Sequence, residues 1–214
     1  MAYSSLEETE FIVQTIAETA IENEKYFSKL DGVVGDGDFG ISLANGFNKL
    51  LDQWEALDRS SPGTFLKKVS MIITSRVGGV SGAIWGTAFM KAGVTASDKQ
   101  ELSAEDVVEM LRAATKGMMK RGKSKLGDKT LLDAFVPATD AFEEVIQNGG
   151  STAEALEAAA KIAREKSEET KDWIAKCGRA SYTGERSIGT YDAGAVAMAV
   201  MAERLAEAWK ERHS

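Results

Sequence analysis

Apolar residues recur at spacings of three and four along the chain, and this pattern constrains the fold more than any other feature. Such spacing places side chains on one face of an α-helix, whereas a half-buried β-strand needs strict alternation, which no β-branched run here sustains. Only two prolines, Pro62 and Pro137, interrupt the 214 residues, and the good helix formers alanine, glutamate, lysine, leucine and methionine are plentiful. The sequence therefore predicts an all-α protein.

We expect a single antiparallel bundle or barrel of about eight amphipathic helices. Ser103-Ala-Glu-Asp106 and Ser151-Thr-Ala-Glu154 are capping-box patterns that start helices, and Pro62 suits a first helical turn. No composition break or low-complexity linker divides the chain, so we expect one domain over residues 1–214. The helices are predicted at 5–29, around 43–54, from 62, at 81–91, from 103, at 130–147, from 151 and at 192–212.

The composition excludes several classes of function. A net charge of −7 at pH 7 disfavours non-specific binding of nucleic acid. The single histidine, His213, is the penultimate residue, so the chain has neither a Ser-His-Asp triad nor a histidine-rich zinc site. Its chemistry must therefore use carboxylates, metal ions, backbone amides and basic side chains.

The sequence also predicts where the protein is found. The single cysteine, Cys177, excludes an internal disulfide and fits a reducing cytoplasm. The start of the chain has neither the basic region nor the apolar run of a signal peptide. No apolar stretch approaches the ~20 residues that a membrane-spanning helix needs. We therefore expect a cytoplasmic protein that binds no membrane.

The stretch from Leu30 to Gly40 crowds three aspartates, Asp31, Asp36 and Asp38, among four glycines. Neighbouring carboxylates repel one another, so a fold keeps them together when a positive charge lies between them. Their hard oxygen ligands suit Mg²⁺ or Ca²⁺. A polar turn between helices is the alternative interpretation, because aspartate and glycine are also common turn residues.

Three further segments combine glycine with polar residues. The glycines of Val77–Gly86 precede a helix and could offer amides to an anion, or could serve close packing between helices. Lys120–Thr130 is the most basic segment and could be a solvated loop. Gly178–Gly194 is long for a loop between helices and carries two arginines. Together with the aspartates, these segments predict phosphate chemistry, in which charge neutralisation and positioning matter more than a histidine base.

The order of these segments resembles the nucleotide-binding L subunit of bacterial dihydroxyacetone kinase over nearly the whole chain. The resemblance is carried by Leu-Asp-x-x-x-Gly-Asp-Gly-Asp (30–38), Val-Gly-Gly-Val-Ser-Gly (77–82), Arg-Gly-Lys…Gly-Asp-Lys-Thr (121–130) and Gly-Arg-Ala-Ser-Tyr-x-Gly-Glu-Arg-Ser-Ile-Gly (178–189). It implies an eight-helix barrel with ADP or ATP in loops at one end. It also implies a separate K subunit that holds the hydroxyketone, to which the L subunit delivers a phosphoryl group.

The resemblance also implies individual site residues. Asp31, Asp36 and Asp38 are the implied ligands of two Mg²⁺ ions. The implied nucleotide-binding residues are Phe39, Gly40, Ile41, Ser42, Val80, Ser81, Gly122, Leu131, Arg179, Asp192, Ala193 and Gly194.

The chain departs from the family pattern at two positions where histidine is usual, and carries Phe39 and Thr190 instead. The substrate is therefore left open between dihydroxyacetone and a longer ketose such as erythrulose. Two phosphoryl donors also stay open: ATP, or a phosphohistidine protein of the phosphoenolpyruvate system that rephosphorylates bound ADP. The missing histidines motivate an alternative function, a catalytically inert nucleotide sensor that docks on a regulator. A Ca²⁺-stabilised structural bundle is a further alternative, although the aspartates lack EF-hand spacing.

Overall fold

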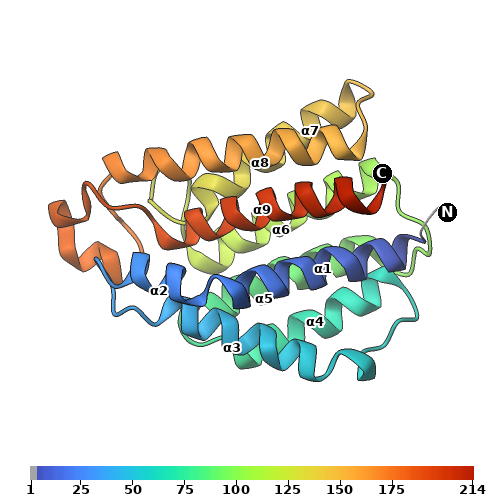
Figure 1. Cartoon of the computed structure of the whole chain (residues 1–214), viewed down its shortest axis with the longest axis horizontal. Helices are drawn as coiled ribbons and strands as arrows, with labels where there is room; N and C mark the ends of the chain where they lie inside the picture. The colour runs from blue at the N-terminus through green and yellow to red at the C-terminus, as the bar shows by residue number, and fades with distance from the viewer. Residues whose placement is uncertain (1–3) are drawn as a thin grey trace.

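The computed structural model describes residues 4–214, and these form nine α-helices and three short 3-10 helices without any β-strand (Figure 1). The prediction of an all-α protein is thus confirmed. The helices are α1 (Ser5–Glu22), α2 (Glu24–Asp31), α3 (Phe39–Asp52), η1 (Trp54–Ala56), α4 (Pro62–Arg76), α5 (Gly79–Ala96), α6 (Ala104–Gly122), α7 (Leu132–Gln147), α8 (Thr152–Glu169), η2 (Thr170–Asp172), η3 (Arg179–Ser187) and α9 (Ala193–Arg212).

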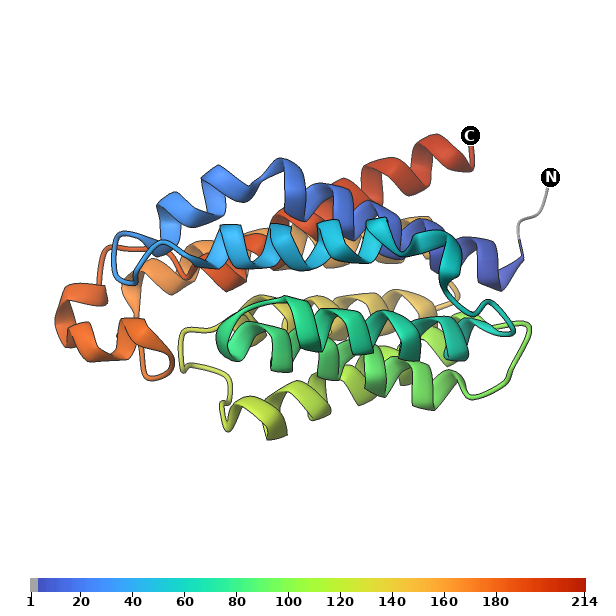
Figure 2. The same ribbon diagram turned by 90° about the horizontal axis from the view of Figure 1, so that it is seen from below.

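The long helices alternate in direction and close into a ring. Each helix from α2 to α8 packs on the next one along the chain, and α9 packs on both α8 and α1. Figures 1 and 2 show the resulting elongated bundle, with the start of α1 and the end of α9 at one end and η3 at the other. We call these the terminal end and the η3 end. Helices α1, α4, α6 and α8 begin at the terminal end, whereas α3, α5, α7 and α9 begin at the η3 end.

Three buried apolar clusters hold the ring together. The largest joins α1–α5 with α9 and with Met110 of α6, and contains the fully buried rings of Phe27, Phe47 and Phe65. The second joins α6–α9 and consists mostly of alanines, which let these helices approach closely. The third is small and lies at the η3 end, where α5, α6 and α7 contribute Ile84, Met118 and Leu132.

Serine side chains cap all four helices that begin at the terminal end. Each hydroxyl of Ser4, Ser61, Ser103 and Ser151 accepts a hydrogen bond from the backbone N–H three residues later. The capping boxes predicted at Ser103 and Ser151 are confirmed, as is Pro62 in the first turn of α4. An equivalent box at Ser4, which was not predicted, caps α1.

The prediction of one continuous helix over residues 5–29 is wrong, because Asn23 divides it into α1 and α2. The Asn23 side chain donates a hydrogen bond to the carbonyl of Thr19 at 2.9 Å, a local bond of the kind by which asparagine competes with helical geometry. The buried stripe of α1 includes Val13, Ala17 and Ala20, while Ile12 and Ile16 are only half-buried.

Three other helices differ from the prediction at their ends. The helix expected around 43–54 covers Phe39–Asp52, and Trp54 lies in η1 instead. The helix expected at 81–91 extends over Gly79–Ala96. The helix expected from residue 130 begins at Leu132, because the Asp133 carboxylate accepts hydrogen bonds from the N–H groups of Gly127 (2.6 Å) and Thr130 (2.7 Å) and folds the preceding backbone into a turn.

Among residues 4–214, no helix has the length and apolarity needed to cross a membrane. Residues 1–3 lie outside the described residues. The predicted domain of 1–214 and the expected absence of a signal peptide both include these three residues, and for them they stay predictions.

Candidate functional site: a polar pocket at the η3 end

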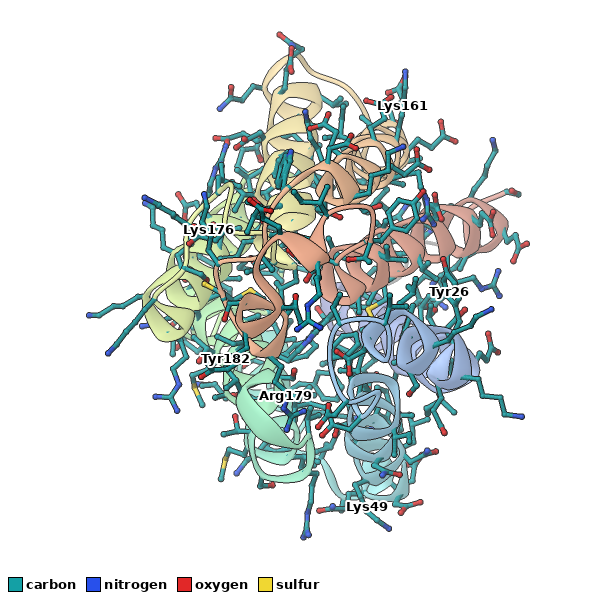
Figure 3. All side chains as sticks on the ribbon, turned by 90° about the vertical axis from the view of Figure 1, so that its left-hand side faces the viewer. Tyr26, Lys49, Lys161, Lys176, Arg179 and Tyr182 are labelled. Atoms are coloured by element: carbon teal, nitrogen blue, oxygen red, sulfur yellow. The ribbon has the colours of Figure 1, made fainter. Side chains whose placement is uncertain are left out.

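A pocket of about 490 Å³ lies at the η3 end, where the starts of four helices converge. Its lining comes from the first turns of α3, α5 and α9, from the residues around the start of α7, from the ends of α2 and α6, and from the segment Cys177–Ala180. Figure 3 looks directly onto this end, with Arg179 and Tyr182 on the segment that passes over it. A helix start presents free N–H groups and the positive end of the helix dipole, so this convergence favours an anion.

The three aspartates predicted as metal ligands come together at the edge of the pocket. Asp31 ends α2, Asp36 lies in the connection and Asp38 is the N-cap of α3. One carboxylate oxygen from each lies within 4.8 Å of the others. Burial raises the pKa of Asp31, and the charges of Asp36 and Asp38 raise it further, so the cluster favours a bound cation.

Arg179 supplies one positive charge to this cluster. Its guanidinium forms ion pairs with Asp36 and, at 3.1 Å, with Asp38. Hydrogen bonding to Asp38 and the two carboxylate charges raise the pKa of Arg179. The contact joins the first and fourth predicted segments, which are 143 residues apart in the sequence.

The glycines of the second segment, Val77–Gly86, serve two different purposes. Some allow close packing between helices, and others leave backbone amides open to an anion. A Cβ at Gly82 or Gly86 would collide with α4 or with the residue that follows it, so these two serve close packing. Gly79 has a φ of +62° and open space around it, and Gly78 precedes it as the N-cap of α5 without a side chain. Both line the pocket, so the first amides of α5 are available to a ligand there.

The third segment is not the solvated loop that its charge allows. Lys129 and Asp128 are buried, and the Lys129 ammonium donates hydrogen bonds to the backbone carbonyls of Ser187 and Thr190 in the fourth segment and of Trp173 before it. The backbone carbonyl of Asp128 also accepts a hydrogen bond from the N–H of Lys176 at 3.0 Å. Hydrogen bonds from the third segment therefore hold the backbone of the fourth segment and of the residues just before it. Lys123 and Lys125, by contrast, are exposed.

Asp192 caps α9 inside the pocket. Its carboxylate accepts a hydrogen bond from the N–H of Ala195 at 2.7 Å, and its own N–H donates to the Thr170 hydroxyl at 3.0 Å. Burial is the main cause that raises the pKa of Asp192 to about 7; the charge of Asp133 adds to this and that of Lys129 opposes it. A carboxyl group in this position can hold a proton near neutral pH.

The floor of the pocket is apolar. Ile84, Met118 and Leu132 form the small buried cluster described above, and Leu131 packs against it. A pocket with a polar, charged rim and an apolar floor fits a ligand that has a phosphate end and an aromatic or apolar end.

The structure brings most of the predicted site residues to this pocket but not all of them. Asp36, Gly40 and Ile41 are outside the lining. Asp36 lies beside it, where its carboxylate forms an ion pair with Arg179. Gly40 is buried against the backbone of α2, and the N–H of Ile41 donates to the Ser28 hydroxyl at 3.2 Å. The predicted residues found in the lining are Asp31, Asp38, Phe39, Ser42, Val80, Ser81, Gly122, Leu131, Arg179, Asp192, Ala193 and Gly194.

Sequence reasoning missed several residues of the pocket. The floor residues Ile84, Met118 and Leu132 carry only the helical spacing of ordinary core positions. Lys129 belongs to the motif at 121–130, but nothing in its neighbouring sequence marks it as buried. Tyr191 also lines the pocket, beside the predicted Asp192.

The two positions where the family pattern has histidine contain residues with defined contacts. The ring of Phe39 packs at a centroid distance of 6.2 Å from that of Phe27. The carbonyl of Thr190 accepts a hydrogen bond from Lys129 at 2.7 Å, and its hydroxyl donates to the carbonyl of Ser187 at 2.7 Å. Neither side chain offers a titratable group to the pocket.

The donor set fits a hard divalent cation. Three carboxylates with oxygens within 4.8 Å of one another, one half-buried and two exposed, match the oxygen ligands and the open, partly hydrated coordination that Mg²⁺ prefers. A Cβ at Gly35 would lie 2.9 Å from the carbonyl oxygen of Asp31 and would crowd its carboxylate, so glycine is needed beside this ligand.

Comparison with known proteins places this geometry in context. A family model described as the DAK2 domain matches residues 33–207. The "PEP-dependent dihydroxyacetone kinase, ADP-binding subunit DhaL" of Escherichia coli (strain K12) is 38% identical over 187 residues, which cover 87% of this chain and 89% of that protein. The corresponding subunit of dihydroxyacetone kinase 2 of Listeria innocua is 39% identical over 180 residues and 82% of its length.

Longer relatives match through one part of their length. The L-erythrulose kinase of Pectobacterium atrosepticum is 36% identical over 85% of this chain but only 31% of its own length. The crystal structure of the dihydroxyacetone kinase of C. freundii in complex with AMP-PNP and Mg²⁺ superposes with a TM-score of 0.74 at 25% identity, covering 97% of this chain and 34% of that one. This chain thus shares its fold with one part of a kinase chain of about three times its length.

Proposed function

The chain belongs to the DAK2 domain family, and from this membership and the pocket at the η3 end we propose that it is the nucleotide-carrying subunit of a hydroxyketone kinase. In this role it holds Mg-ADP or Mg-ATP and passes a phosphoryl group to dihydroxyacetone, or to a related ketose, that a separate K-type subunit holds. The E. coli and Listeria proteins that match over most of their own length are named as ADP-binding subunits of such kinases.

The observation that carries this proposal is the meeting of three features in one pocket. The aspartate cluster, the uncapped start of α5 and the apolar floor come from separate parts of the sequence and surround one pocket of about 490 Å³. A nucleotide needs all three, because it combines bound cations, anionic phosphates and a flat base.

Individual residues have separate tasks in this proposal. Asp31, Asp36 and Asp38 hold two Mg²⁺ ions, which when bound neutralise phosphate charge. The amides of Val80 and Ser81 at the start of α5 bind phosphate oxygens. Ile84, Met118 and Leu132 accept the base and keep water away from it. The remaining predicted residues of the lining, from Phe39 to Gly194, complete the pocket.

The phosphoryl donor is the finer part of the proposal. Among the relatives quoted above, those of similar length are described as PEP-dependent. We therefore favour ADP as a resident cofactor that a phosphohistidine protein of the phosphoenolpyruvate system rephosphorylates in place. The kinase crystallised with AMP-PNP and Mg²⁺ is a much longer chain, and ATP as an exchanging substrate is the competing possibility.

Thermal melting with and without Mg²⁺, crossed with ADP and ATP, tests nucleotide binding directly. A ligand at 100 times its dissociation constant adds about 2.7 kcal/mol of stability. For a domain of this size that corresponds to a rise in Tm of about 5–10 °C. We expect the shift to need both metal and nucleotide, and to be larger with ADP than with ATP if ADP is resident. A folded protein that shows no shift with either nucleotide contradicts the proposal.

An assay of turnover tests the second part of the proposal, the transfer of a phosphoryl group to a ketose. The chain is combined with a K-type subunit, dihydroxyacetone or erythrulose, and either ATP or a phosphoenolpyruvate-driven donor system. Phosphorylated ketose is the expected product with at least one pairing. Nucleotide binding without turnover under any donor would favour the alternative, a nucleotide-sensing partner of a regulator.

A further inference from the structure

Lys129 occupies an environment that is unfavourable for a lysine in two respects. Its exposed fraction is 2%, although burial of an unpaired ammonium is costly. Its φ is +62°, a left-handed conformation that glycine adopts easily and lysine does not. The neighbouring Lys123 and Lys125 carry the same charge but are exposed, so the basic character of the segment does not explain why Lys129 is buried.

Its hydrogen bonds explain how the ammonium is accommodated. An ammonium group has three N–H donors, and Nζ of Lys129 faces three backbone carbonyls: those of Trp173 at 3.1 Å, Ser187 at 2.5 Å and Thr190 at 2.7 Å. Burial lowers the pKa of Lys129, while the charges of Asp192 and Asp172 oppose this effect. Three matched acceptors and two nearby carboxylates favour the charged form.

These three carbonyls bracket the segment that passes over the pocket. Trp173 lies before its start, and Ser187 and Thr190 lie at its end, so one ammonium fastens both ends of the intervening chain. Between them, Gly178 and Gly184 have φ values of +64° and +57°, which are backbone conformations that few other residues would stabilise. Arg179 projects from this span toward the aspartates (Figure 3).

We propose that Lys129 is a positioning residue, which fixes the span 173–190 over the pocket and thereby sets the place of Arg179 beside Asp36 and Asp38. Lys129 acts through the backbone of the span and not by contact with the nucleotide. The effect on nucleotide binding rests on the proposed function, whereas the effect on the span itself does not.

A double-mutant cycle tests whether Lys129 acts through Arg179. Lys129→Met keeps the length and apolar stem but removes the three donors. Arg179→Gln removes the guanidinium, and Lys125→Met is the matched control on an exposed lysine of the same segment. We expect Lys129→Met to speed the dissociation of Mg-ADP at least tenfold and Lys125→Met to change it less than twofold. The double variant should lose no more than Arg179→Gln alone, within twofold, because coupled residues are not additive.

Hydrogen exchange of the protein without nucleotide tests the span independently. In Lys129→Met we expect amides of residues 173–190 to exchange at least tenfold faster, while those of α3–α6 keep their rates. An equal acceleration throughout the helices would mean a general loss of stability and would overturn the proposal. The proposal would also be overturned if the effects of Lys129→Met and Arg179→Gln on Mg-ADP dissociation multiplied in the double variant. Unchanged exchange rates for residues 173–190 in Lys129→Met would overturn it as well.

Chemical rescue provides a second route if Lys129→Met folds poorly. Lys129→Ala leaves room for the missing three carbons and the ammonium, so n-propylammonium should restore slow exchange of 173–190. Propan-1-ol and tetramethylammonium are the controls, since the first lacks the charge and the second lacks N–H donors. Equal rescue by either control, or no rescue by n-propylammonium, contradicts the proposal. If the wild type binds no nucleotide, the proposed function fails, and the exchange experiments still decide the role of Lys129.

Discussion

The two ends of the bundle begin their helices in different ways. At the terminal end, Ser4, Ser61, Ser103 and Ser151 cap α1, α4, α6 and α8 with their hydroxyls. At the η3 end, the N-cap residues of α3, α5 and α7 make no such side-chain bond, and only Asp192 caps its helix, α9. One end therefore satisfies its helix starts internally, and the other leaves several of them to neighbouring groups or to a ligand.

Because of this difference, the helix starts at the terminal end contribute to stability, whereas those at the η3 end are available for binding. A side-chain cap contributes about 1 kcal/mol to the stability of its helix by accepting a bond from a free backbone N–H. A helix start without a cap forgoes that contribution but presents its amides to an anion. Substitutions at the terminal end should accordingly change Tm, and substitutions at the η3 end should change ligand affinity.

Removal of the aspartate cluster should have the largest effect. Asp36→Ala or Asp38→Ala removes one carboxylate of the predicted metal site, and we expect at least a 100-fold loss of Mg-dependent affinity for ADP, measured by calorimetry. Because both side chains are exposed, loss of their ion pairs with Arg179 should change Tm by no more than about 2 °C. Asp52→Ala, at the opposite end of α3, is the control and should leave affinity unchanged. Retained affinity in both variants would refute the metal assignment.

The second prediction concerns pH. The folded pKa of Asp192, about 7, lies above the unfolded value of 3.8, so the folded state binds more protons between these values. Its contribution to stability is therefore present at low pH and is lost as pH rises through 7, by at most about 2 kcal/mol between pH 5.5 and 8. Asp192→Asn keeps an N-cap side chain and removes the titration. It should reduce the fall in Tm over this range.

Comparison of the wild type with the variant isolates Asp192 from other groups. Burial also raises the pKa values of Asp31 and Asp133, so these residues add a fall of the same sign to both proteins. Parallel Tm profiles for the wild type and Asp192→Asn would show that Asp192 does not titrate in this range.

A serine cap introduced at the start of α5 should make this helix of the η3 end resemble those of the terminal end. Gly78 has an extended conformation, φ −70° and ψ 163°, close to that of the capping serines. Gly78→Ser should therefore place a hydroxyl on the first amides of α5 and reduce nucleotide affinity about tenfold, or about 1.4 kcal/mol. The gain in stability should be only a few tenths of a kcal/mol.

Gly78→Ala separates the cap from the added bulk. It introduces the same Cβ, which would approach the Ser42 hydroxyl at 2.9 Å, but no oxygen to accept a hydrogen bond. A loss in Gly78→Ala equal to that in Gly78→Ser would attribute the effect to crowding of Ser42 and not to the amides.

Removal of a terminal-end cap should have the smallest effect on the site. Ser103→Ala breaks the capping box with Asp106 and should cost about 1 kcal/mol, which lowers Tm by about 2–4 °C. The dissociation constant for Mg-ADP should stay within twofold of the wild type. Ser151→Ala repeats the experiment on α8, and a clear loss of affinity in both variants would contradict the separation of the two ends.

The terminal end was the easier half to predict, because its signals are local. A capping box lies within four residues, and helical spacing extends over about three turns, so both can be recognised in the sequence. The break at Asn23 was missed because asparagine is tolerated in many helices and nothing nearby marks this one as an end. At the η3 end, the predicted start of α7 was wrong because the Asp133 carboxylate bonds to the backbone before it.

The η3 end depends on contacts between distant segments, which a single sequence reveals only in part. Crowded charge identified the aspartates, and the family resemblance identified most of the pocket. Gly82 and Gly86 could not be distinguished from Gly78 and Gly79 until α4 was in place beside them. Lys129 could not be recognised as buried, because its three acceptors are backbone carbonyls 44 to 61 residues away.

The positions of the start of α1 and the end of α9 limit how this protein can be joined to another. His213 contacts Glu8, so the end of α9 and the start of α1 lie together, remote from the pocket (Figure 1). The 20 residues of α9 rise about 30 Å between them and the first residues of the site. A substrate-binding domain fused after α9 would need at least about nine extended linker residues to return to the pocket. Reporter domains attached at either end need no such reach and should leave the pocket open to a partner.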